Sequence, residues 1–243
     1  MEQDIFSHNK ELYMTTQDKL FLQSEGNCWF NRNAKELSSK EKNSLDHPIN
    51  MIKAHNLKPK NVLEIGCSNG WRLGRIHDEF GSICVGIEPS ENAINEGKKI
   101  FPDIEFRRGI AANLPVKEDE KFDLVIVNYV LHWISRESLM KSISEIDRIV
   151  KDGGHLIIGD FFPDSPARVP YHHLPEKDIY TFKLDYPKIF LSTATYAEVD
   201  KEIYAHGDKT KCGTDISSNI RSQCCLLKKS YRDSYPDINL TPL

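Results

Sequence analysis

The stretch Asn61-Val-Leu-Glu-Ile-Gly-Cys-Ser-Asn-Gly70 decides the fold. Its apolar first half ends at Gly66, and a short apolar run closed by a turn signal is typical of a strand buried in a parallel sheet. Gly66 allows a tight turn and a close approach of the backbone to a ligand. Residues 71–80 then carry apolar side chains near helical spacing. The stretch therefore predicts a strand, a glycine turn and a helix in direct succession.

The same alternation continues along the chain. Ser90 is a suitable N-cap for the next helix. Strands that do not alternate in polarity, separated by helices, imply a mostly parallel sheet covered on both faces, with right-handed crossovers. The sequence thus predicts an α/β fold with a Rossmann-like doubly wound sheet. Further strands are expected at residues 82–87, 104–107, 122–127 and 155–161, and further helices at 90–100 and 135–150.

The two ends of the chain show weaker patterns. Residues 1–45 are polar with scattered aromatic side chains, so they form either a loose arm or one or two amphipathic helices. Residues 196–205 and 221–229 look like two strands with no long helix between them, which predicts an antiparallel hairpin at one edge of the sheet. We expect one domain over residues 1–243, divided into an N-terminal arm or cap (1–45), a core (58–162), an acceptor cap insertion (163–210) and a closing hairpin (196–229).

Composition limits the classes of function. The 243 residues carry a net charge of −4 with scattered basic side chains, which argues against a nucleic-acid backbone as the main partner. No apolar run approaches the ~18 residues of a membrane-spanning helix, and the first residues lack the apolar segment of a signal peptide. We therefore expect a cytoplasmic protein whose six cysteines are reduced thiols. The oligomeric state is not indicated.

Ligands of an open parallel sheet bind outside the carboxyl ends of its strands. The first such end is not the dinucleotide pattern G-x-G-x-x-G, because Ser68 stands where that pattern needs its second glycine. The acid before the turn, Glu64, suits a ligand with a positive centre and an amino group. Glu88 ends the second strand, 18 residues after Gly70, where an acid can accept both hydroxyls of a ribose. Residues 109–115 form a turn that can present backbone groups to an adenine edge.

Four segments, in the right order and spacing, resemble the motifs of class I S-adenosylmethionine (SAM) dependent methyltransferases. They are Glu64-Ile-Gly-Cys-Ser-Asn-Gly70, Val85-Gly-Ile-Glu-Pro-Ser90, Phe122-Asp-Leu-Val-Ile-Val-Asn-Tyr-Val-Leu-His-Trp133 and Ile149-Val-Lys-Asp-Gly-Gly-His-Leu-Ile-Ile158. The resemblance covers about residues 58–162. Within the family, the segment is most similar to the small-molecule methyltransferases. It implies SAM as cofactor and S-adenosylhomocysteine as product.

The resemblance also implies roles for particular residues around the cofactor. The methionine part would be wrapped by Gly66, Cys67 and Gly70, with Glu64 orienting the loop and Asn128 nearby. Glu88 and Pro89 would lie at the ribose. Arg32 either pairs with the methionine carboxylate or is a surface arginine. The family has an acid at the position of Ile110, where it accepts from the adenine amino group. Here the backbone of Ala111 takes that place in our prediction, and we expect weaker cofactor binding.

Candidate catalytic residues lie beyond the fourth and fifth strands. His132 is a candidate general base because histidine titrates nearest neutral pH, although packing is an equal alternative. Tyr129 is a second donor at the same edge, and Asp160 either orients a histidine or caps the next segment. His172 and His173 lie in the Pro-rich cap and are candidates too, with exposed loop residues as the alternative. No metal site is expected.

The leading interpretation is methyl transfer to a small polar acceptor at oxygen, with a bacterial surface-glycan or capsule precursor as one candidate. A first alternative is an RNA or protein methyltransferase. The segment Asn128-Tyr-Val-Leu131 lacks the prolines that nucleic-acid N-methylating enzymes often carry there, which argues against it. A second alternative is a non-catalytic SAM-binding module, suggested by Ile110.

Overall fold

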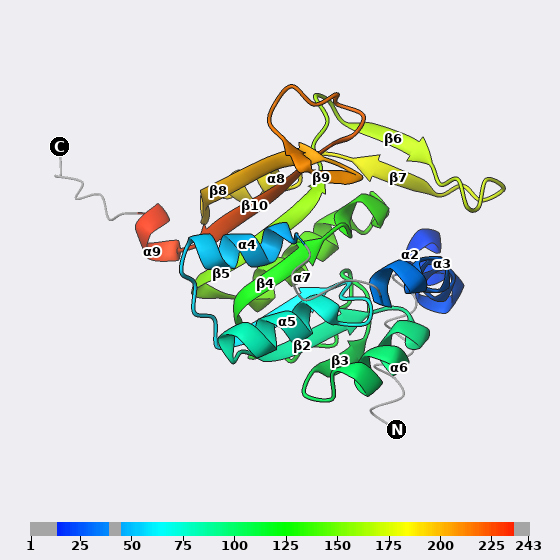
Figure 1. The fold of residues 1–243 in the computed structure, drawn as a ribbon. Coiled ribbons are helices and arrows are strands. Elements are labelled where there is room, and N and C mark those ends of the chain that lie inside the picture. Colours follow the sequence, from blue (N-terminus) through cyan, green and yellow to red (C-terminus); the bar gives the residue numbers. More distant parts are fainter. Residues whose placement is uncertain (1–13, 39–44, 236–243) are drawn as a thin grey trace.

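The computed structural model describes residues 14–38 and 45–235, and its centre is an eight-stranded sheet with the order β3-β2-β1-β4-β5-β10-β8-β9 (Figure 1). The pairs among β1 to β5 are parallel, and β10 is antiparallel to both β5 and β8. The expected α/β fold with a mostly parallel sheet is confirmed. The strands are β1 (Asn61–Ile65), β2 (Ile83–Glu88), β3 (Glu105–Arg108), β4 (Phe122–Asn128), β5 (Val150–Phe161), β8 (Tyr196–Ala205), β9 (Asp208–Cys212) and β10 (Arg221–Lys229).

Helices cover both faces of this sheet. One apolar core packs α4 (His47–Ala54), α5 (Trp71–Phe80) and α6 (Glu91–Ile100) on one face, and a second core packs α7 (Leu139–Ile149) and α8 (Pro187–Leu191) on the other. The alternation of a strand is visible at β10, where Cys224 belongs to the first core and Cys225 to the second. A short helix, α9 (Tyr231–Ser234), follows β10.

The antiparallel hairpin is confirmed, with one difference in its position. Its second strand, β10, lies between β5 and β8, so the first strand of the hairpin is displaced outward. The short strand β9 then pairs with the end of β8 and was not predicted. β10 fits between two partners because its side chains are buried on both faces, whereas β8 is largely half-buried or exposed.

Two predicted boundaries are wrong. The helix expected at 135–150 begins only at Leu139, after the short 3-10 helix η2 (Leu131–Trp133) and a turn. The strand expected at 155–161 begins at Val150, because residues 152–154 form an irregularity inside β5 rather than a break. Gly153 has a positive φ of 79° there, which glycine adopts without strain.

The segments outside the core lie together at one end of the sheet. Residues 16–38 are helical throughout, as α2 (Thr16–Leu20), the π-helix η1 (Phe21–Glu25) and α3 (Gly26–Ser38), and α3 packs on α6. A separate ribbon of β6 (Ala167–Pro170) and β7 (Tyr180–Lys183) lies above them (Figure 1). Gln17 joins the two, since its side chain donates to the Tyr180 carbonyl at 3.0 Å.

The helices in the described ranges are too short or too polar to cross a bilayer.

Candidate active site

The loop after β1 depends on two glycines. Gly66 and Gly70 have positive φ angles of 70° and 76°, in the left-handed region that favours glycine. A side chain would also find no room, because a Cβ on Gly66 would overlap Val130 and a Cβ on Gly70 would overlap the Phe106 ring. The loop is tied to β2, since Gly66 N–H donates to the Ile87 carbonyl at 2.7 Å. These contacts hold a rigid turn at the carboxyl end of β1.

Cys67 contributes to this loop through its backbone, while its side chain lies in the core. Its side chain is buried against Gly86, pointing into the core beneath the turn. Burial raises the pKa of the thiol well above its ordinary value, so the sulfur stays protonated. The thiol therefore packs in the core, and a role of Cys67 at the cofactor would rest on its backbone.

Glu88 holds two loops together at the end of β2. Its carboxylate accepts from Ser68 N–H at 2.8 Å and from Ser90 N–H at 2.9 Å. Burial raises the pKa of Glu88 to about 7, and the two backbone donors only partly oppose this shift. Each carboxylate oxygen still has a lone pair for a further donor. Pro89 follows, and its carbonyl accepts from Arg108 Nε at 3.2 Å.

Glu64 belongs to a buried group of charged side chains under the loop. Its carboxylate is bound by Arg72 in the first turn of α5, and Arg72 Nε and Nη2 each lie 3.0 Å from the carboxylate of Asp46. All three side chains are buried. Burial alone would raise the pKa of Asp46, but the charge and hydrogen bonds of Arg72 hold it below its ordinary value. The direct partner of Glu64 is thus an arginine of the chain.

Arg72 was missed because nothing in its local pattern marks it. Asp46 carried a usable signal: it precedes His47-Pro48, and Asp before a helix with Pro in its first turn is an N-cap pattern. It does cap α4, accepting from Ile49 N–H at 3.2 Å.

The loop after β3 makes the expected turn. Asn113 N–H donates to the Ile110 carbonyl at 3.0 Å, and Gly109 N–H donates to the Glu88 carbonyl at 3.1 Å. Ala111 is buried and Ile110 is half-buried. The turn is therefore attached to the strand that carries Glu88, although the Ile110 side chain brings no polar group to it.

The end of β4 carries an unusual backbone and an unpaired amide oxygen. Tyr129 has a φ of 57°, which is rare for a bulky side chain and is typically found at functional sites. Its hydroxyl donates to Tyr204 Oη at 3.3 Å, and burial raises the pKa of Tyr129. The side chain of Asn128 lies over Gly159. Its Oδ1 is buried and has no hydrogen-bond partner among the residues that the structure describes.

His132 and Asp160 form a buried pair. His132 Nδ1 lies 2.9 Å from Asp160 Oδ1, and the same carboxylate accepts from the N–H groups of His132 at 3.2 Å and Phe161 at 2.8 Å. A carboxylate only accepts, so Nδ1 carries a proton, and in the neutral form of the ring Nε2 keeps a lone pair. The structure brings together two residues that were predicted separately.

His172 and His173 lie elsewhere. Both are exposed on the turn between β6 and β7, with ring centroids 3.9 Å apart. The other ring contact described for each of them is with Tyr171. In the described part of the chain neither histidine contacts His132 or Tyr129, which favours the alternative of exposed loop residues.

The predicted partner of Arg32 is also replaced by an internal one. Its guanidinium binds the buried carboxylate of Glu25 and lies 3.1 Å from Tyr171 Oη. The helix that carries it is docked beside the Glu88 loop, because Asn27 Oδ1 accepts from Ser90 Oγ at 2.8 Å. The N-terminal helices thus lie next to the cofactor loops, but Arg32 is already paired.

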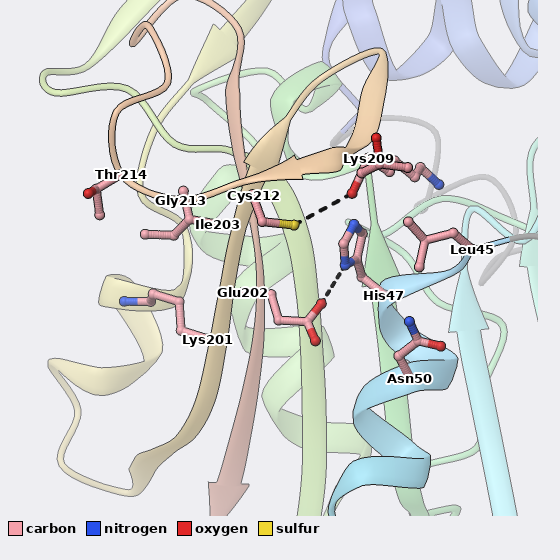
Figure 2. Close-up of a pocket in the computed structure, with 11 residues that line it drawn as sticks. Leu45, His47, Asn50, Lys201, Glu202, Ile203, Lys209, Cys212, Gly213 and Thr214 are labelled. Atoms are coloured by element: carbon pink, nitrogen blue, oxygen red, sulfur yellow. Dashed lines mark hydrogen bonds and ion pairs between the residues drawn. The ribbon is translucent and has the colours of Figure 1, made fainter.

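A hollow of about 630 Å³ lies apart from these residues, between α4 and the β8–β9 edge (Figure 2). His47 lines it, with Nδ1 bound to Glu202 and its ring stacked on Tyr204 at 3.8 Å. None of the residues predicted for the active site lines this hollow.

Comparison with protein families gives a match to the segment that carries these strand ends. Residues 63–158 match a family model described as a methyltransferase domain, a segment that runs from β1 into β5. This segment of the chain is similar to methyltransferase domains. The match includes the Gly66, Glu88 and His132 loops, and the sheet order agrees with the fold that the sequence motifs implied.

The curated relatives match only part of this chain. The ubiquinone/menaquinone biosynthesis C-methyltransferase UbiE of Campylobacter jejuni is 28% identical over 110 residues, covering 43% of this chain and 46% of its own. An uncharacterized methyltransferase of Synechocystis is 31% identical over 99 residues, covering 41% and 46%. The chain therefore spans less than half the length of these curated relatives.

Solved structures extend the likeness of fold over nearly the whole chain. A 1,6-didemethyltoxoflavin-N1-methyltransferase of Burkholderia thailandensis, solved with 1,6-didemethyltoxoflavin and S-adenosylhomocysteine, has a TM-score of 0.64 at 13% identity and covers 89% of this chain and 91% of its own. The N-methyltransferase NodS of Bradyrhizobium japonicum, solved with S-adenosylhomocysteine, has a TM-score of 0.52 at 15% identity, covering 91% and 97%.

Proposed function

We propose that the protein is a SAM-dependent methyltransferase that methylates an oxygen of a small polar acceptor, in a cytoplasmic setting. The observation that carries the proposal is the His132–Asp160 pair beside the glycine loop of a methyltransferase domain. The residues of the glycine loop and Glu88 can bind a nucleoside and an amino acid. The His132–Asp160 pair can take a proton from a nucleophile.

The residues at the ends of β1, β2 and β4 fit SAM. The carboxylate of Glu88 has free lone pairs that can accept from ribose hydroxyls. The glycine turn at Gly66 lets the backbone come close to the cofactor. The buried Asn128 Oδ1 needs a donor, which the amino group of the methionine part provides; Ser68 Oγ is likewise buried without a partner in the described ranges. Buried polar atoms are seldom left unpaired, so these two atoms support an occupant.

When bound, SAM supplies an electrophilic methyl group on a sulfonium. Its acceptor must be held in line, and good positioning contributes roughly 7–11 kcal/mol. In our proposal His132 Nε2 takes the proton of an acceptor hydroxyl, while Asp160 fixes the ring and stabilises its charged form. A general base of this kind contributes about 10²–10⁴ in rate.

The relatives do not determine the acceptor atom. UbiE is named a C-methyltransferase, and the two solved neighbours are named N-methyltransferases. Oxygen is favoured here because a hydroxyl must lose its proton, whereas an unprotonated amine attacks without a base. His132 and Asp160 provide that base in a buried position.

The test is a pair of measurements on the full chain. Calorimetric titration with S-adenosylhomocysteine checks cofactor binding, and release of S-adenosylhomocysteine from SAM checks turnover with a panel of hydroxylated metabolites, including surface-glycan and capsule precursors. We expect micromolar binding and turnover with a hydroxylated small molecule.

Each other outcome favours a different reading. Binding without turnover on any substrate supports the non-catalytic module, and turnover with total RNA or a protein extract alone supports the macromolecular alternative. No binding at millimolar ligand contradicts the proposal itself.

A further inference from the structure

Two basic side chains from the C-terminal segments meet at the ring that follows Asp160. Lys183 Nζ, at the end of β7, lies 4.2 Å from the centroid of the Phe161 ring. The ring of His206, just after β8, lies 4.8 Å from Phe161 and 5.2 Å from Tyr129. Phe161 in turn lies 5.1 Å from the His132 ring. The two basic groups therefore adjoin the proposed base.

Lys183 makes no ion pair with a carboxylate in the described ranges, although the charge of Asp160 partly opposes the effect of burial on its pKa. Its ammonium donates to the carbonyl of Asn219 at 2.8 Å and otherwise faces an aromatic ring. Lys201 has a similar exposure but is paired with Glu198 at 2.7 Å. The pKa of Lys183 is lowered by burial, whereas the pKa of Lys201 is raised by Glu198 against the effect of burial. A half-buried cation without an anion is costly, and an anionic ligand would relieve that cost.

Asp160, the carboxylate whose charge acts on Lys183 and His206, already accepts hydrogen bonds from other groups. Asp160 accepts three hydrogen bonds from His132 and Phe161. The pKa of His206 is lowered by burial, then by His132 and Lys183, with Asp160 in opposition. The cation of Lys183 therefore lies close enough to act on His206, and an anion placed between the two would be favourable.

Aromatic rings also pack together at the same place. The rings of Tyr129 and His132 stand nearly perpendicular to Phe161, at 80° and 79°. Aromatic faces and edges pack well against another ring. This part of the molecule therefore combines aromatic rings, the basic side chains of Lys183 and His206, and the ring nitrogen of His132.

We infer that the acceptor is a small ring compound that carries both a hydroxyl and a carboxylate. The carboxylate binds Lys183 and His206, and the hydroxyl faces His132 Nε2. This inference rests on the proposed methyltransferase function and names the substrate class of that site. Two sources share the chemistry: hydroxylated aromatic acids and uronic acids.

The experiment compares acids with their neutral amides. The full chain, saturated with S-adenosylhomocysteine, is titrated with 2-hydroxybenzoate and 2-hydroxybenzamide in one arm, and with galacturonate and galacturonamide in the other. We expect the acid of one arm to bind at least about tenfold more tightly than its amide, the size of a charge-assisted hydrogen bond. The arm that responds identifies the source.

Variants locate the preference. Lys183→Met should lose it, while Lys183→Arg, which keeps the charge, and Lys201→Met, a lysine with a similar exposure but a carboxylate partner, should retain it. An unchanged affinity for S-adenosylhomocysteine in all three shows that they are folded. Equal binding of acid and amide in both arms, no binding of any of the four compounds, or a preference that survives in Lys183→Met overturns the inference.

The titrations are repeated without S-adenosylhomocysteine. A chain that does not bind S-adenosylhomocysteine contradicts the proposed function, while the acid preference at Lys183 still decides the inference.

Discussion

Two groups of residues at the carboxyl ends of the parallel strands differ in how they are built. We call the Gly66–Gly70 loop, Glu88 and the turn at 109–113 the cofactor rim, and Tyr129, His132, Asp160 and Phe161 the acceptor rim. Each rim has a buried carboxylate at a strand end. Glu88 accepts from backbone N–H groups of neighbouring loops, whereas Asp160 accepts from a histidine side chain as well as from backbone.

The difference has a structural cause. Backbone donors are fixed by turns, so the cofactor rim needs only glycines and one acid at set spacings. The acceptor rim is completed by side chains such as Lys183 and His206, from segments far along the chain. A cofactor common to many enzymes can be bound by turns and one acid, whereas a particular acceptor needs specific side chains. The predictions below test that division.

The largest effect is expected at the acceptor rim. His132→Gln should lower kcat by about 10²–10⁴-fold, because the variant lacks a base for the acceptor hydroxyl. Its affinity for S-adenosylhomocysteine should stay within twofold of wild type. The matched control is His172→Gln, an exposed histidine that should change neither value. A loss of equal size in the control would remove the distinction between these histidines.

The next effect concerns the support of the cofactor rim. Arg72→Met leaves the buried carboxylates of Glu64 and Asp46 without their arginine, and should lower the free energy of unfolding by about 3–5 kcal/mol. Arg107→Met, which removes a more exposed pair with Glu120, should cost about 1 kcal/mol or less. Urea unfolding of both variants checks this, and similar midpoints would mean that the buried cluster contributes little.

The pKa of Glu88 gives a pH dependence. Its folded value of about 7 lies above its ordinary value near 4.5, so its contribution to stability is fully present below pH 4.5 and is lost as pH rises through 7. Glu88→Gln resembles the protonated form and lacks this titration. The stability of wild type relative to Glu88→Gln should therefore fall by about 3 kcal/mol between pH 4.5 and pH 8. A difference that is flat with pH contradicts the shift.

The smallest effect tests the one departure from the family pattern. Ile110→Asp should strengthen S-adenosylhomocysteine binding about threefold to tenfold, because it restores an acceptor for the adenine amino group. Ile110→Ala supplies no acceptor and should not gain. Titration with the inosine analogue, which lacks the amino group, should show no gain for Ile110→Asp; a gain there would assign the effect to something other than this contact.

The sequence indicates the cofactor rim better than the acceptor rim, for physical reasons. Apolar runs, Gly66 and Ser90 act locally, and the structure has the predicted strand, turn and N-cap at those positions. The pairing of Arg72 with Asp46 and of Arg32 with Glu25 depends on which helices meet, which local patterns do not encode. The ribbon of β6 and β7 was missed because its short, exposed or half-buried strands lack a clear apolar pattern.

The division between the rims is tested most directly by one titration series. Wild type, Glu88→Gln and Asp160→Asn are titrated with S-adenosylhomocysteine at pH 8, after circular dichroism shows that all three are folded. We predict that Glu88→Gln binds at least about tenfold more weakly, because it loses a charged acceptor for the ribose hydroxyls, and that Asp160→Asn stays within twofold of wild type. Equal weakening in both variants, or no binding by wild type at millimolar ligand, would contradict the assignment of the cofactor to the carboxyl ends of β1 and β2.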